Sequence, residues 1–120
     1  RDRLAREVTG AQLAEAQRLA SAWDEAHPVE AVRWYRLAAE QGNASAMSNL
    51  GVMCNGGRGV VQDYVQAHMW RNVAASRQTG EERKISADGR DALARLMTPA
   101  QIAEAQRLAR EWDAAHPREP

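Results

Sequence analysis

The chain has 120 residues and carries 16 basic and 16 acidic side chains, so its formal net charge is zero. This length suits one domain with one modest core, and the balanced charge disfavours nucleic-acid binding, which needs a basic surface. No apolar stretch approaches the roughly 20 residues that cross a bilayer, which disfavours membrane insertion. Frequent alanine and sparse β-branched residues favour an all-α fold.

The first predicted element is a helix over residues 10–26, after the capping residue Thr9. Its apolar side chains recur at helical spacing on one face, at Leu13, Ala16, Leu19, Ala20 and Trp23. Residues 1–28 recur as residues 90–117, with 20 of 28 positions identical. The two ends of the sequence are therefore near-copies of one another.

The middle of the sequence predicts three helices, over residues 29–41, 44–54 and 64–77. Gly42 follows the first helix and suits the left-handed conformation that often ends a helix. Asn43 and Asp63 precede the other two helices and are good N-caps. Each of these helices is thus bounded by residues with a physical reason to stand there.

A glycine-rich loop over residues 55–62 joins the last two of these helices. Gly57 and Gly59 supply the positive φ angles that a tight reversal needs. A phosphate-binding loop would be followed by Lys and then Ser or Thr, whereas Val60 and Val61 follow here. We interpret the segment as a turn.

The C-terminal part predicts a helix over residues 81–96, which carries Ile85, Leu93 and Leu96, and a helix over residues 99–115. Thr98, Pro99 and Gln101 form a capping box with Pro at the first helical position. Gly89 costs about 1 kcal/mol relative to Ala within a helix, so the sequence leaves open whether the first of these helices is continuous.

A pattern A-x-x-W-x-x-x-A-A occurs twice, 36 residues apart, at residues 31–39 and 67–75. This offset is typical of helix-turn-helix solenoid repeats. Residues 44–80 resemble the Sel1-like repeat, a relative of the tetratricopeptide repeat. The matching residues are Ala46, Leu50, Gly51, Gly57, Gly59, Asp63, Ala67, Trp70, Ala74 and Ala75. Residues 31–42, with Trp34 and Ala38, resemble the second helix of a preceding repeat.

The resemblance implies a right-handed α/α solenoid of antiparallel helix pairs, with about six helices. Small residues would let the helices approach closely, and we expect Trp34 and Trp70 to be buried between successive pairs. The domain organisation that follows has three parts: a helical tail of a preceding array at 1–28, a repeat core at 29–80 (half repeat 29–43 and full repeat 44–80), and closing helices at 81–120.

These features predict a non-catalytic scaffold that binds a protein or peptide segment on the concave face of the solenoid. The residues of the first helix that the core pattern leaves free, and that we expect to contact a partner, are Ser45, Ser48, Asn49 and Val52. An alternative is self-assembly or domain exchange through the related terminal helices, giving a homo-oligomer. A weaker alternative is a hydrolase-type enzyme.

Few side chains offer chemistry, and we expect no cofactor and no metal. Cys54 is the single cysteine, which excludes an internal disulfide, and we expect it to be a small buried hydrophobe rather than a nucleophile. The pairs Asp24–His27 and Asp113–His116 have a spacing that could contribute to a zinc site. A histidine interacting with a helix C-terminus explains them better.

The remaining polar candidates are interpreted as surface residues. His68 lies beside the Trp70 face, and we expect it to be exposed. Arg18, Arg107 and Arg110 could bind an acidic partner, but isolated surface charges contribute little, and we interpret them as solvated.

The sequence begins Arg1-Asp2-Arg3 rather than with methionine, which indicates an excised or processed piece. We expect a soluble bacterial protein, and the sequence leaves periplasm and cytoplasm both open.

Overall fold

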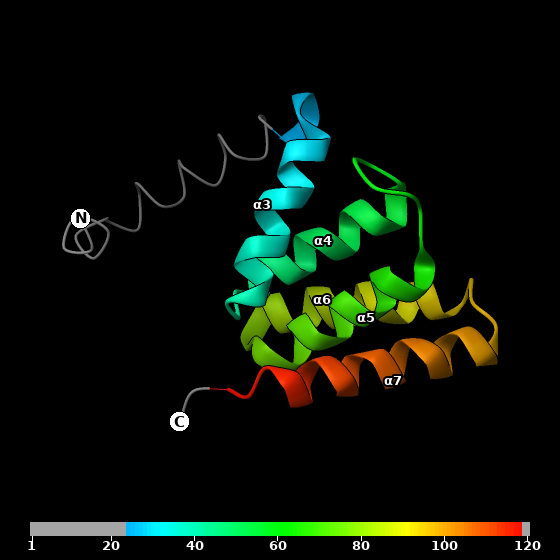
Figure 1. Cartoon of the computed structure of the whole chain (residues 1–120). Coiled ribbons are helices and arrows are strands. Elements are labelled where there is room, and N and C mark those ends of the chain that lie inside the picture. Colours follow the sequence, from blue (N-terminus) through cyan, green and yellow to red (C-terminus); the bar gives the residue numbers. More distant parts are fainter. Residues whose placement is uncertain (1–23, 119–120) are drawn as a thin grey trace.

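The computed structural model describes residues 24–118, and every regular element in that range is an α-helix. The helices are α3 (Pro28–Glu40), α4 (Ala44–Gly56), α5 (Tyr64–Arg77), α6 (Gly80–Ala94) and α7 (Pro99–Ala115) (Figure 1). The all-α prediction is therefore confirmed. Most of the helix predicted over residues 10–26 lies outside the described residues.

Side-chain caps start α4, α5 and α7 at the predicted positions. Asn43 Oδ1 and Asp63 Oδ1 each accept a hydrogen bond from the backbone N–H three residues on, at 2.9 and 3.0 Å. Thr98 and Gln101 form the reciprocal capping box, with bonds of 3.1 and 2.9 Å. These bonds satisfy N–H groups that a helix terminus leaves without an internal partner.

Glycines end two of the helices, and another glycine lies inside α6 without breaking it. Gly42 ends α3 with φ at 89°, and Gly57 ends α4 with φ at 67°, both in the left-handed region. The α4 helix thus extends through Gly56, two residues beyond the predicted end. The α6 helix runs from Gly80 to Ala94 without a break, so Gly89 neither splits nor ends it.

The central helix of the described part is α5, which packs against α4, α6 and α7, while α3 packs against α4. Figure 1 shows that α4 and α5 run antiparallel, as do α6 and α7. The helices α5 and α7 run in the same direction, and Arg77 at the end of α5 pairs with Asp113 near the end of α7 at 2.9 Å. This stacking of helix pairs is the solenoid arrangement that the sequence predicts.

Small residues bring α4 and α5 close together. Ala46, Ala67 and Ala74 are buried. A Cβ added to Gly51 would lie 3.2 Å from the backbone oxygen of Ala67 and 2.8 Å from Cγ of Arg71. Any side chain at Gly51 would therefore push the two helices apart.

Trp34 is an exception to the expected burial. Its exposed fraction is 68%, whereas Trp70 is only 8% exposed. Trp70 packs edge-on against Trp112 of α7, with ring centroids 5.7 Å apart. The α3 helix buries Ala31 against the core, and no helix of residues 24–118 covers the side that carries Trp34, so the prediction for this residue is wrong.

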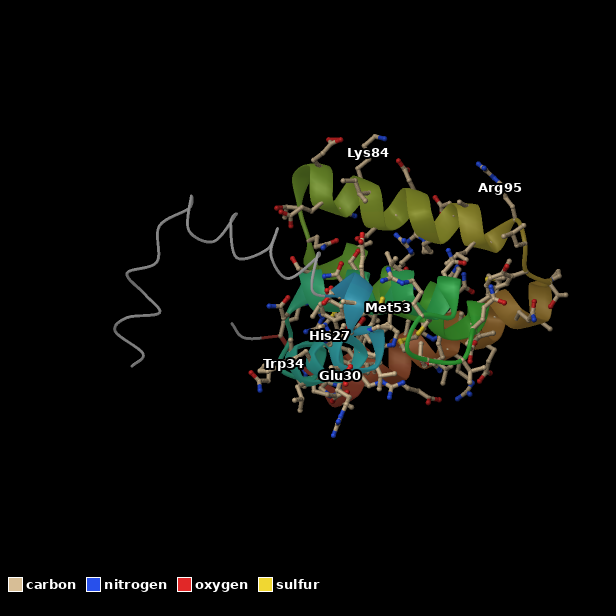
Figure 2. All side chains as sticks on the ribbon, turned by 90° about the horizontal axis from the view of Figure 1, so that it is seen from above. His27, Glu30, Trp34, Met53, Lys84 and Arg95 are labelled. Carbon is tan, nitrogen blue, oxygen red and sulfur yellow. The ribbon has the colours of Figure 1, made fainter. Side chains whose placement is uncertain are left out.

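Figure 2 shows from above that Trp34 lies at the edge of the helices, whereas the buried Met53 lies among them. None of the helices in the described range is long and apolar enough to cross a membrane.

Candidate functional site

One side of the solenoid is formed by α4 and α6. We define the α4–α6 surface by four residues of α4 and one of α6: Ser45, Ser48, Asn49, Val52 and Gly89. Ser45 and Asn49 are exposed, and Val52 is 43% exposed. The adjacent residues Leu50 and Gly51 are buried in the core. Three of the four predicted contact residues are therefore available at the surface of α4.

The fourth predicted residue, Ser48, holds the two helices together. Its Oγ lies 3.2 Å from Oγ of Ser86, which is buried. Ser86 donates its hydrogen to Oε1 of Gln78 at 2.6 Å, so Ser48 is the donor in the bond between the two serines. Because its hydroxyl is used in these hydrogen bonds, Ser48 stabilises the fold and is not available to a partner.

Arg71 of α5 extends between α4 and α6. On the α4 side its Cγ lies against Gly51, and on the α6 side a Cβ at Gly89 would lie 2.1 Å from its Nη1. The Nε atom is buried without a hydrogen-bond partner, and burial lowers the pKa of the guanidinium. Arg71 was not among the predicted site residues. The one hint of it in the sequence is Gly89, a glycine that lowers the stability of α6 and leaves room for a side chain from another helix.

His68 lies one helical turn before Arg71 and is buried, with an exposed fraction of 3%. It faces α6, and the prediction that it is a surface residue is wrong. Burial lowers the pKa of His68, with a smaller effect in the same direction from Arg90 and an opposing one from Asp91. His68 is therefore held neutral near pH 7.

Cys54 is buried, with an exposed fraction of 4%. Burial raises the pKa of its thiol, more than Arg36 lowers it. The thiol, not the reactive thiolate, is thus the stable form. This environment matches the small hydrophobe that the sequence predicts.

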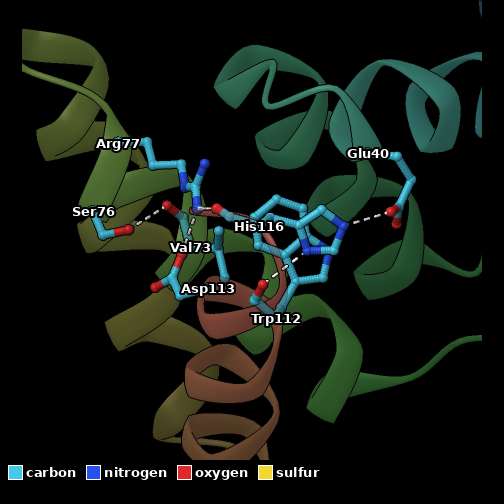
Figure 3. Close-up of polar contacts among 7 residues, drawn as sticks. All are labelled: Glu40, Val73, Ser76, Arg77, Trp112, Asp113 and His116. Atoms are coloured by element: carbon cyan, nitrogen blue, oxygen red, sulfur yellow. Dashed lines mark hydrogen bonds and ion pairs between the residues drawn. The ribbon is translucent and has the colours of Figure 1, made fainter. Parts of the chain in front are cut away.

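The C-terminal ends of α3, α5 and α7 meet in a polar cluster (Figure 3). Arg77 donates to Asp113 at 2.9 Å and to the carbonyl oxygen of His116 at 2.6 Å, and its guanidinium lies over the Trp112 ring. His116 stacks on Trp112, with centroids 3.9 Å apart. Its Nδ1 lies 2.8 Å from the Trp112 carbonyl oxygen, and its Nε2 lies 2.8 Å from the Glu40 carboxylate.

Both ring nitrogens of His116 therefore face acceptors, which favours the protonated ring. The bond to the Trp112 carbonyl raises the pKa of His116 most, followed by the bond to Glu40. A cleft of about 550 Å³ opens at this end of the molecule. Glu40, Arg77 and His116 in its wall already have partners within the protein.

The aspartates of the two Asp–His pairs considered for zinc both have other partners. Asp113 pairs with Arg77, as described above, and Asp24 accepts a hydrogen bond from the Tyr35 hydroxyl. Between residues 24 and 118, no group of three or more His, Cys, Asp or Glu side chains could hold a metal ion.

The predicted arginine candidates differ in their surroundings. Arg107 pairs with Glu104 and Glu111 along the exposed face of α7. Arg110 is exposed, and Arg18 lies outside the described residues.

Comparison with known families finds a match for the segments that form α3, α4 and α5. The family model of the Sel1 repeat matches residues 27–43 and 44–77. Residues 27–77 of the chain are therefore similar to Sel1 repeats. Sel1 repeats are generally protein–protein interaction modules and are typically non-catalytic. No curated protein matches the chain.

Proposed function

We propose that this protein is a non-catalytic scaffold, and that the α4–α6 surface binds a segment of another protein. The observation that carries the proposal is the exposed stripe Ser45, Asn49 and Val52. These residues stand four and three positions apart, so they lie on one face of α4. The stripe is about 10 Å long at the helical rise per residue, enough to contact a short extended segment.

The chemistry of this stripe suits the backbone of a peptide. The Asn49 amide has donors and an acceptor, and the Ser45 hydroxyl can do either. Val52 adds apolar contact at the end of the stripe. Exposed polar groups beside a rigid, buried helix face lose little conformational freedom on binding, which favours affinity.

A peptide selection tests the proposal. Random peptides displayed on phage would be selected against the whole protein, and their affinities measured for the wild type and for a double variant, Ser45→Ala with Asn49→Ala. Gln106→Ala, an exposed substitution on α7, is the matched control. We expect the double variant to bind at least about tenfold more weakly, since two hydrogen bonds are lost, and the control to bind as the wild type does. Equal binding by all three proteins would refute the proposal.

A second candidate function, assembly between copies of the protein, is favoured by the bare face of α3. Trp34 and Leu37 are 68% and 62% exposed, whereas their counterparts 36 residues later, Trp70 and Val73, are buried. The helix that packs on Trp70 is α7, over Pro99–Ala115. The protein thus contains the α5 face twice, and one copy of that face is uncovered.

The second copy of α7 is the segment 10–26, and we infer that it covers the bare face in another molecule. Because α7 runs parallel to α5, the equivalent packing needs residues 10–26 to run parallel to α3. Only His27 separates this segment from the start of α3 at Pro28, so the two cannot run parallel side by side within one molecule. A second molecule can supply the segment, which is domain exchange.

Light scattering over a hundredfold range of concentration tests this assembly. We expect the mass of the wild type to rise above 13.3 kDa with concentration, and the mass of Trp34→Gln to stay constant. Ile85→Gln is the control, because Ile85 is also an exposed apolar residue but belongs to α6 rather than to α3. A constant wild-type mass, or a rise that Trp34→Gln does not reduce, would exclude assembly through this face.

A further inference from the structure

We propose that Arg71 is a binding site for a carboxylate group, and that it anchors an acidic or C-terminal residue of the protein segment bound at the α4–α6 surface. The identity of the ligand's source rests on the function proposed above. The binding of a carboxylate at Arg71 is a separate claim, argued from the surroundings of this side chain.

Arg71 lacks the partner that a partly buried arginine normally has. Within residues 24–118 it makes no hydrogen bond and no ion pair, and its Nε is buried and unsatisfied. Arg77, further along α5, and Arg90, on α6, are both paired. Arg77 bonds Asp113, although its Nε is also unsatisfied, and Arg90 bonds Asp91 and Asn72. Burying a charge without a partner is costly, so an unpaired arginine in this position points to an external anion.

Two glycines make the room that the side chain occupies. Gly51 of α4 borders its Cγ, and a Cβ at Gly89 of α6 would lie 2.1 Å from Nη1 and 2.6 Å from Cζ. Glycine lowers the stability of a helix interior, so Gly89 is disfavoured by its own helix. The guanidinium group is what this position accommodates.

Comparison of the two repeat units shows that Arg71 is a local departure. The equivalent residue in α3, 36 positions earlier, is Tyr35, which donates its hydroxyl to Asp24. In the complete repeat, residues 44–80, this position is Arg71, a cation, and no carboxylate of residues 24–118 takes the place that Asp24 has beside Tyr35. The difference places a positive charge between α4 and α6, one helical turn beyond the Ser48–Ser86 bond.

A carboxylate fits this site best among the groups that a protein segment offers. The planar guanidinium presents a fork of N–H groups that matches the two carboxylate oxygens. The terminal nitrogens of Arg71 are not among the buried unsatisfied atoms, in contrast to Nε, so an anion can reach them from solvent. Asn49 and Val52 flank this position on α4 and would contact the residues next to the anchored one.

Nuclear magnetic resonance on the whole protein tests the site. N-acetylglycine mimics the C-terminus of a polypeptide, the α-amide of N-acetylglutamate mimics an acidic side chain, and N-acetylglycinamide is the uncharged control. We expect a saturable shift of the Arg71 Nε–H resonance with at least one of the two carboxylates and none with the amide. The tighter carboxylate identifies the source, and tighter binding of inorganic phosphate than of either would overturn the assignment.

Substitutions separate binding from structure. Carboxylate binding should also shift the amide resonances of Gly51 and Gly89. Arg71→Gln should abolish these saturable shifts. Gly89→Ala should weaken carboxylate binding at least about tenfold, because the added methyl group displaces the guanidinium, while the circular dichroism spectrum stays that of the wild type. Arg110→Gln, which removes an exposed arginine on α7, should bind as the wild type does. Equal binding by Gly89→Ala and the wild type would refute the proposal.

The outcome is distinguishable from failure of the proposed function. If the small carboxylates do not bind at Arg71, while Ser45→Ala with Asn49→Ala still weakens the selected peptides, then Arg71 is not an anchor and the interaction surface stands. If both measurements fail, the surface itself is wrong.

Discussion

At the scale of single residues, His116 ties the end of α7 to the end of α3. Its ring is fully hydrogen-bonded only when both nitrogens carry hydrogen, since one faces the Trp112 carbonyl and the other the Glu40 carboxylate. The stacked Trp112 ring is uncharged, and the Arg77 cation nearby opposes protonation less than these bonds favour it. The proton on His116 is therefore part of the folded structure.

This arrangement predicts a pH-dependent stability. The folded-state pKa of His116 is raised above its usual value of 6.5. Its contribution is thus fully present below the unfolded pKa and is lost as pH rises through the folded pKa. We expect His116→Gln to unfold at a lower temperature than the wild type at about pH 5.5, with the difference shrinking at about pH 8.5. Thermal melts at both values check this, and a difference independent of pH would contradict it.

At the scale of elements, one aromatic side chain of α7 makes several of the contacts between α7 and α5. Trp112 touches the Trp70 ring edge-on, lies under the Arg77 guanidinium and stacks against His116. We expect Trp112→Ala to lower the free energy of unfolding by about 3 kcal/mol. Urea unfolding measures the change, with Gln106→Ala on the exposed side of α7 as the reference. A loss no larger than that of the reference would mean that other contacts dock α7.

The α6 helix gives the opposite prediction. Ala is favoured over Gly in a helix interior by about 1 kcal/mol, and the atoms that a Cβ at Gly89 would meet belong to the flexible end of Arg71. We expect Gly89→Ala to leave the free energy of unfolding unchanged or raise it by up to about 1 kcal/mol. Urea unfolding tests this as well. Clear destabilisation by Gly89→Ala would contradict the prediction, because it would show that the Arg71 side chain cannot move away from the added methyl group.

At the scale of the whole molecule, the elements of residues 28–115 are predictable from the sequence because their signals are local. Asn43, Asp63 and Thr98 cap the helices that follow them, and each cap needs only the backbone three residues on. Glycines at the turns act in the same local way. The helices therefore begin where the sequence indicates.

What the sequence does not reveal is which helix covers a given face. Trp34 and Trp70 stand in the same nine-residue pattern, yet only Trp70 is covered, because α7 packs on α5. His68 is buried near Arg90 and Asp91 of α6. Arg71 was missed because its glycine neighbours come from two other helices. These differences depend on contacts between segments that are distant in the sequence.

The contact between Glu40 and His116 joins residues 76 positions apart, whereas α5 packs against the helices before and after it. Helical proteins dominated by such local contacts fold rapidly. We therefore expect the Glu40–His116 tie to form after the folding barrier is crossed, and contacts formed that late act on the unfolding rate. Stopped-flow measurements should show the wild type unfolding more slowly as His116 is protonated, with its folding rate unchanged, and His116→Gln should lack this response. Acidity would then act as a latch that slows the opening of the molecule without hastening its formation.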